Sequence, residues 1–468
     1  MSVSKLLHVF SGFQARERRQ LMRDAESGIL AATPEELKLL IHLEQLDSRK
    51  ELSAYKREEA MNLLFPGFNE DDQRMRLLES TLLDRLEVYL INLELLHDQD
   101  TRTLLAATAY HRRNLPKAFR YEADQLQKAV DGIVDADGLL VRYELSRLQL
   151  QHNSRNLSRK QPLDFNRVVE SLDAWYIASK LKHACEIINA RNVLTVDAEL
   201  RLMDEVRKMA DTSPFINEPV VAAYRLVYDS LTQPDQEQVI DELQQFMRER
   251  GWKFPFSEQR ELFQYMKNYC IKKLNTGKTE YTQKLYSIYK LTLDNEAFLE
   301  DEPLSPFEFK NMVTIALRLG EFEWVEKFIP MHLKYLQKEY RLNAETYNLG
   351  NYHFFRKDYK ATLRLFQQVE FTDVFYALDV RSILLKIYFE QQDDDLFFYQ
   401  ASSFRTFLSR HKQVSAYQRI IYRNFIRFAA LILRAEGDPQ KLNAIAKEME
   451  EVKQVADIRW LREKCHIE

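Results

Sequence analysis

Residues 343–369, NAETYNLGNYHFFRKDYKATLRLFQQV, decide the fold of this chain. The stretch predicts two short amphipathic helices joined by a tight turn at residues 356–358. Tyr359, Leu363 and Phe366 recur at i, i+4 and i+7, which places them on one apolar face of the second helix. Neither helix is long enough to bury such a face alone, so this pair of helices is expected to pack against neighbours.

The composition of the whole chain agrees with a helical fold. Its 468 residues include only 10 Gly and 12 Pro, well below the average usage of these turn residues. A β-rich protein of this length would need many more turns. Lys and Arg number 67 against 71 Asp and Glu, giving a net charge of −4. This balance provides no global basic field for nucleic acid or for an anionic membrane.

Cysteine usage and hydropathy point to the cytoplasm. Cys185, Cys270 and Cys465 lie far apart, and their odd number does not suit a disulfide framework. The first residues lack the apolar core and cleavage site of a secretory signal. The longest apolar run, residues 428–433, is far shorter than the ~20 residues that cross a bilayer. We therefore expect a soluble cytoplasmic protein with no membrane segment.

Helical signals continue along the chain on both sides of residues 343–369. Thr33, Pro34 and Glu36 predict a capping box with Pro at the first helical position. A helix over about 71–97 is expected to be unusually long. Residues 149–162 form the one polar, weakly hydrophobic stretch, so they mark a predicted boundary. The expected domains are an N-terminal helical subdomain over 1–150 and a helical-repeat array over 164–468.

The central pair of helices resembles a tetratricopeptide (TPR) repeat. With Tyr347 at the fifth repeat position, Leu349 and Gly350 occupy the seventh and eighth, where Gly lets the first helix approach its neighbour closely. Thr362 then occupies the twentieth position and Phe366 the twenty-fourth. The sequence departs from the family pattern at three positions, Thr346 for Trp, Thr362 for Ala and Val374 for Pro.

Similar units begin near Pro306 and Leu378, at spacings of 37 and 35 residues from Asn343. These spacings are close to the 34 residues of the TPR family. Pro330 lies within the second helix of the first unit and is expected to kink or end it. The resemblance implies an all-α, right-handed α-solenoid that is TPR-like in its C-terminal half and has an N-terminal helical cap or subdomain.

Residues 14–97 allow a second interpretation. Their helix-break-helix pattern looks like part of the winged-helix head that some bacterial regulators join to TPR-like repeats. Arg74, Arg76 and Arg85 would then be its basic contacts. No β-hairpin pattern follows the second helix, and that helix carries mixed charge, so nucleic-acid binding is not the expected function. The basic stretch 110–121 is similarly followed at once by acidic residues and favours a solvated helix face.

The sequence contains no recognisable catalytic or cofactor motif. Neither a phosphate-binding Gly-rich loop nor a nucleophile elbow nor a zinc-binding HExxH motif occurs. His183 and Cys185 are two residues apart, a spacing that points side chains away from each other on a helix. We therefore predict no catalytic residues, no metal site and no cofactor, and an enzyme of unrecognised type remains an alternative.

The resemblance to TPR proteins implies a groove lined by the first helix of each pair, where a protein or peptide partner binds. Amide side chains in such a groove can both donate to and accept from a peptide backbone. The predicted groove residues are Lys310, Asn311, Arg318, Tyr347, Asn348, Asn351 and Phe355. The expected function is thus that of a non-catalytic protein-binding scaffold, and the sequence does not indicate an oligomeric state.

Overall fold

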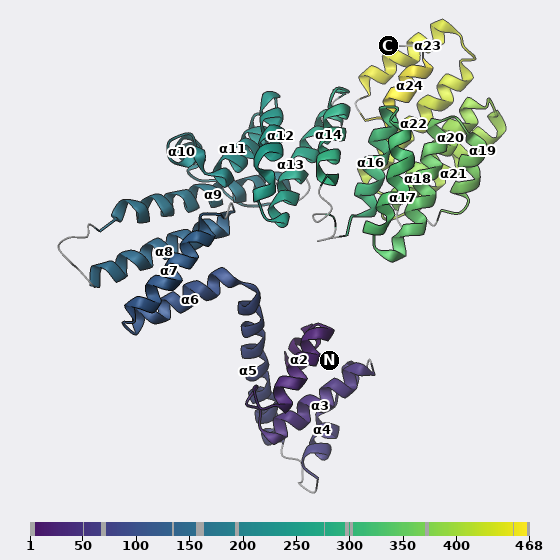
Figure 1. Ribbon diagram of the computed structural model, residues 1–468. Coiled ribbons are helices and arrows are strands. Elements are labelled where there is room, and N and C mark those ends of the chain that lie inside the picture. Colours follow the sequence, from purple (N-terminus) through teal and green to yellow (C-terminus); the bar gives the residue numbers. More distant parts are fainter. Residues whose placement is uncertain are drawn as a thin grey trace. The chain divides into compact units, whose positions relative to one another are not determined.

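The computed structural model is all-helical, as the sequence predicts. It describes residues 5–49, 51–66, 72–132, 135–155, 163–191, 196–275, 277–294, 299, 303–369, 374–452 and 454–465. Helices hold 81% of these described residues, and no strand occurs among them (Figure 1). The all-α class is confirmed, whereas the solenoid arrangement stays a prediction.

The chain divides into two compact units, residues 1–225 and 226–468, and the division falls within α11 (Pro219–Thr232). The other helices of the first unit are α1 (Lys5–Gly12), α2 (Ala15–Glu26), α3 (Pro34–Ser48), α4 (Arg57–Leu64), α5 (Asp72–His97), α6 (Gln99–Arg112), α7 (Pro116–Val130), α8 (Ala136–Arg155), α9 (Phe165–Arg191) and α10 (Met203–Ala210), with 3-10 turns η1 (Leu52–Ala54) and η2 (Phe215–Asn217).

The helices of the second unit are α12 (Gln238–Arg250), α13 (Phe256–Asn275), α14 (Tyr281–Leu293), α16 (Pro306–Arg318), α17 (Phe322–His332), α18 (Arg341–Phe355), α19 (Tyr359–Phe366), α20 (Val374–Glu390), α21 (Asp394–Arg410), α22 (Ala416–Arg434), α23 (Pro439–Glu451) and α24 (Ile458–Lys464). Its 3-10 turns are η3 (Gly251–Lys253), η4 (Leu333–Tyr335) and η5 (Lys338–Tyr340).

Local signals in the first unit produce the expected elements. Thr33 and Glu36 form the predicted capping box at the start of α3. The long predicted helix is α5, whose buried Leu82 and Leu86 pack in one core with Leu39 of α3. A separate core joins α6, α7 and α8. The first unit thus contains two apolar cores of its own.

The predicted boundary at 150–164 lies inside the first unit. Helix α8 extends through its first part, and residues 156–162 are outside the described residues. On either side of it, α8 and α9 pack together, and the hydroxyls of Ser146 and Ser171 lie 3.3 Å apart. Polarity of the connecting segment therefore marks a loop between packed helices, and the division of the chain comes later.

Three helix pairs in the second unit turn in the same way. Gly320, Lys357 and Gln392 follow α16, α18 and α20, and each has a positive φ. In each turn the next residue donates its backbone N–H to a carbonyl five residues earlier, at 2.9–3.0 Å. This geometry satisfies a carbonyl at the end of the first helix. The turns recur at the predicted spacings of 37 and 35 residues.

The central pair, α18 and α19, packs closely at the predicted glycine. A side-chain carbon added at Gly350 would overlap the ring of Phe366. The Thr362 hydroxyl donates to the Gly350 carbonyl at 3.3 Å, which joins the two helices at the same point. Asp358 caps α19 by accepting from the N–H of Ala361. These contacts explain the residues that carry the resemblance. In α17, Pro330 lies one turn before the helix ends at His332.

Candidate functional site

The predicted groove residues lie on two neighbouring first helices. Lys310, Asn311 and Arg318 belong to α16, and Tyr347, Asn348, Asn351 and Phe355 belong to α18. Their exposure differs sharply. Arg318 is exposed, Lys310, Asn311 and Phe355 are half-buried, and the other three side chains are buried.

Asp379 of α20 takes the polar groups that were expected to face a ligand. Its carboxylate pairs with the Lys310 ammonium at 2.6 Å. It also accepts hydrogen bonds from the hydroxyls of Tyr347 at 3.3 Å and Tyr422 at 3.4 Å. Burial, and then the nearby Asp379 charge, raises the pKa of both tyrosines well above its usual value. Helices α16, α18, α20 and α22 are thus joined at one carboxylate.

Tyr376 of α20 closes the same face from the other end of α16. Its hydroxyl donates to the Pro306 carbonyl at 3.4 Å, and its ring stacks on Phe307 with centroids 6.2 Å apart. The ring also meets Tyr347 edge-on at 4.6 Å. Side chains of α16 and α20 therefore meet over α18.

This closure corrects the prediction for three residues. Tyr347, Asn348 and Asn351 are 1%, 0% and 3% exposed, so they have almost no surface to present to a partner. Asn348 Nδ2 donates to the Ala344 carbonyl at 2.7 Å, and its buried Oδ1 has no partner among the described residues. Helical spacing identified the correct face of α18, but that face is covered by the chain itself.

The C-terminal segment packs on the far end of α20. Asp457, which precedes α24, pairs with Lys386 at 2.8 Å and accepts from Ser382 at 2.8 Å. Burial opposes ionisation of Asp457, but Lys386 and Ser382 outweigh it and lower the pKa of that carboxyl. Trp460 donates to Glu390 and packs on Phe389. These contacts hold the end of the chain in place.

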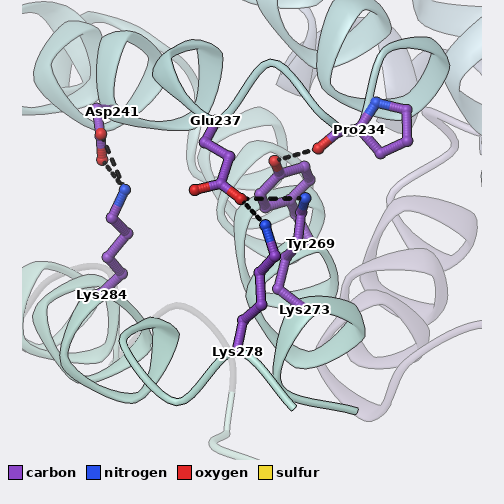
Figure 2. Close-up of polar contacts among 7 residues, drawn as sticks. All are labelled: Pro234, Glu237, Asp241, Tyr269, Lys273, Lys278 and Lys284. Carbon is purple, nitrogen blue, oxygen red and sulfur yellow. Dashed lines mark hydrogen bonds and ion pairs between the residues drawn. The ribbon is translucent and has the colours of Figure 1, made fainter. Parts of the chain in front are cut away.

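Lysines of α13 and α14 are also engaged within the second unit. Lys273 and Lys278 both pair with Glu237, and Lys284 pairs with Asp241 at 2.8 Å (Figure 2). Tyr269 donates to the Pro234 carbonyl beside them at 2.9 Å. Glu237 and Asp241 thereby tie α12 to the α13–α14 pair, which gives these lysines a structural role.

The strongest local charge lies in residues 396–435, which we call the basic segment. It contains seven Arg or Lys residues and no Asp or Glu, in a chain that is acidic overall. It covers most of α21 and α22. The start of α22 is fixed by a capping box between Ser415 and Gln418. Several basic side chains of this segment therefore project from two well-formed neighbouring helices.

An open cleft of about 520 Å³ lies between α21 and α22 and is lined by Arg405, Thr406, Ser409, Arg423 and Arg427, which we call the basic cleft. Arg405 and Ser409 are one turn apart on α21, as are Arg423 and Arg427 on α22, so each pair shares a helix face.

The three arginines of the basic cleft differ in their partners. Arg427 pairs with Glu448 of α23. Arg405 and Arg423 are exposed, and within the described part of the chain neither has an acidic partner. Two guanidinium groups on facing helices are therefore available to an anion.

The two hydroxyls of the basic cleft are bonded to their own helix. Thr406 donates to the Ser402 carbonyl at 3.0 Å, and Ser409 donates to the Arg405 carbonyl at 3.1 Å. Those carbonyls belong to the helix and can also accept its backbone N–H groups, so the hydroxyl protons can turn towards a ligand. The cleft thus offers neutral donors beside its charged ones.

The basic cleft was not among the sequence predictions. The available signal was the absence of acidic residues over 396–435, which local stretches of a few residues do not show. The i, i+4 spacing of Arg423 and Arg427 was a second signal. Which helix would face them could be known only from the fold.

The described residues do not assemble a recognisable catalytic centre. No group of three or more His, Cys, Asp or Glu side chains with metal-binding geometry occurs among them. All three cysteines are buried, and burial raises the pKa of Cys270 to about 12 and that of Cys465 above its usual value. A thiol with a raised pKa is a weak nucleophile at neutral pH.

The arginines proposed for a DNA-binding head have partners in the first unit. Arg85 pairs with the buried Glu36 at 2.9 Å, the carboxylate that also caps α3. Arg74 stacks over the ring of Phe65 at 4.0 Å. The strand pairing of a winged helix is absent from the described residues of this region.

Comparisons with known proteins add no family assignment. No protein-family model, no curated protein and no solved structure matches this chain. Among the described residues, no helix combines the length and apolarity needed to span a membrane.

Proposed function

We propose that this chain is a non-catalytic, cytoplasmic protein-binding scaffold that holds an acidic segment of a partner protein in the basic cleft. The observation that carries the proposal is the pair Arg405 and Arg423, two exposed guanidinium groups on facing helices without an acidic partner in the described chain. Arginine suits this role because its planar fork donates two parallel hydrogen bonds to a carboxylate.

The architecture that we propose is a solenoid of helix pairs, TPR-like from Pro306 onward. It is supported by the three turns after α16, α18 and α20, which share a positive-φ residue and one hydrogen-bond pattern at spacings of 37 and 35 residues. Repeats of this kind commonly present binding surfaces to other proteins. In our proposal the partner binds at the α21–α22 cleft, because the face shared by α16, α18 and α20 is filled.

An array of random twelve-residue peptides tests this function for a partner of any sequence. Peptides that bind the wild-type protein should be enriched in Asp and Glu. Arg405→Ala and Arg423→Ala should each weaken binding about tenfold, since hydrogen bonds to charged groups contribute ~1.5–3 kcal/mol. Binding should also weaken as salt rises.

Arg364→Ala is the matched control, because Arg364 is an exposed arginine on α19 outside the basic cleft. It should bind the same peptides as the wild type, and circular dichroism should show all variants equally helical. Acidic peptides that bind the Arg405→Ala and Arg423→Ala variants unchanged would place the site elsewhere. An array with no acidic enrichment would refute the function itself.

A further inference from the structure

The net charge of the basic cleft matches a dianion. Three guanidinium groups line the cleft, and one carboxylate, that of Glu448, pairs with Arg427 at its edge. No acidic side chain is among the lining residues. The cleft therefore carries a charge of about +2. A phosphorylated side chain carries about −1.5 to −2 at pH 7, whereas a glutamate carries only −1.

The donors of the basic cleft surround a small volume from two sides. Arg405 projects from α21 and Arg423 from α22. A phosphoryl group has three terminal oxygens arranged tetrahedrally, so it can accept from guanidinium groups on both walls at once. A planar carboxylate has two oxygens and fits one guanidinium fork. The hydroxyls of Thr406 and Ser409 supply further donors for the third phosphoryl oxygen.

Other cations of the basic segment are already engaged. Arg419 donates to the carbonyls of Leu408 and His411, and Arg434 lies over the ring of Phe398. Available positive charge is thus concentrated at the cleft. Nucleic acids instead require cations that follow a row of phosphates. This distribution favours a single phosphoryl group over a polyanion.

Apolar side chains lie next to the cations on α22. Tyr417 and Ile420 are 59% and 46% exposed, and Ile420 is one turn before Arg423. Exposed apolar groups beside an anion site can hold the side chains that neighbour a phosphorylated residue in a peptide. From charge, donors and surroundings together, we infer that the basic cleft recognises a phosphoserine or phosphothreonine of the partner protein. This inference rests on the proposed function of the same cleft.

Paired peptides provide the test. Each Ser- or Thr-containing peptide of an array is printed in phosphorylated and unphosphorylated form, and the full-length protein is applied to both. The phosphorylated member should bind about tenfold more tightly. Inorganic phosphate at millimolar concentration should release it, and glutamate at the same concentration should not.

Arg423→Lys separates charge from geometry, because lysine keeps the charge and lacks the bidentate fork. This variant should retain binding to acidic peptides and lose most of the gain from phosphorylation. Arg364→Ala should retain both. Lowering the pH from 7.5 to 5 should reduce the gain from phosphorylation in the wild type, because the second phosphate pKa is about 6 and arginine stays charged.

The outcomes separate this inference from the proposed function. Equal binding of both peptide forms, with acidic enrichment retained, overturns the phosphoryl inference and leaves the acidic-peptide function intact. Absence of acidic and phosphorylated peptides from the bound set overturns both. A twelve-nucleotide single-stranded RNA that binds more tightly than every phosphopeptide also overturns the inference.

Discussion

The amide of Asn348 is enclosed on α18, with its nitrogen bonded to the Ala344 carbonyl and its oxygen bonded to nothing in the described chain. A buried acceptor without a partner keeps its desolvation penalty and gains no hydrogen bond in return. Asn348 is therefore a poor candidate for ligand binding and a good candidate for stabilisation.

Asn348→Leu should leave stability unchanged or raise it by up to ~1 kcal/mol, because an apolar side chain of similar size removes the unpaired oxygen. Asn348→Asp should lower stability by ~1–3 kcal/mol or more, since it buries a charge without a cation to pair with it. Urea unfolding followed by circular dichroism measures both. A large loss in Asn348→Leu would indicate that a polar group, such as a bound water, satisfies the oxygen.

At the scale of single elements, the close packing of α18 on α19 depends on Gly350. Gly350→Ala should destabilise the protein by ~1–3 kcal/mol, because the added methyl meets the Phe366 ring. Helix propensity alone would favour the change by ~1 kcal/mol, so the sign of the measured effect decides between the two. Thermal unfolding provides the measurement.

Phe366→Leu offers the control for this contact. The double variant Gly350→Ala, Phe366→Leu should be more stable than the sum of the single effects predicts, because the smaller side chain makes room for the methyl. Additive effects would show that the two positions do not meet.

Helices α6 and α8 bury a pair of histidines. Nδ1 of His111 lies 3.4 Å from Nδ1 of His152, and Phe119 of α7 stacks on the His152 ring. Burial lowers the pKa of both residues below 6.5, with a further contribution from Arg155. Other cations that face the pair are Arg112 and Arg120.

This pair should make stability fall in weak acid. Unfolded histidines take up protons as the pH drops through 6.5, whereas the folded pair does so only at lower pH, so acid favours the unfolded chain. The unfolding midpoint should therefore drop between pH 7.5 and 5 more in the wild type than in His152→Phe. An identical pH dependence in the two proteins would contradict this prediction.

Sequence patterns identified elements better than their environments. Thr33 and Glu36 predicted a helix start correctly because capping is local. Gly350 was likewise explained by its immediate neighbour. Exposure of Asn348 was predicted wrongly, because its cover comes from side chains of α16 and α20, and periodicity carries no information about contacts between non-adjacent helices. Recognition of the cleft at Arg423 required the same missing information.

At the scale of the whole molecule, each unit has its own cores, and the second is joined across four helices by Asp379. Asp379→Ala should lower the stability of the second unit by ~1–3 kcal/mol, because three donors lose their acceptor. Hydrogen exchange should accelerate in α16–α22 and stay unchanged in α1–α5. Glu326→Ala, an exposed carboxylate on α17, serves as the control. Faster exchange throughout both units would show that they unfold as one.

The acid-free composition of residues 396–435 also has a kinetic consequence. A concentrated positive field on a chain with a net charge of −4 attracts an anionic partner locally, while the remaining surface repels it on average. Encounters would then be biased towards one orientation. Salt should therefore slow association far more than it speeds dissociation, and the protein would find its partner quickly even where the final complex is short-lived.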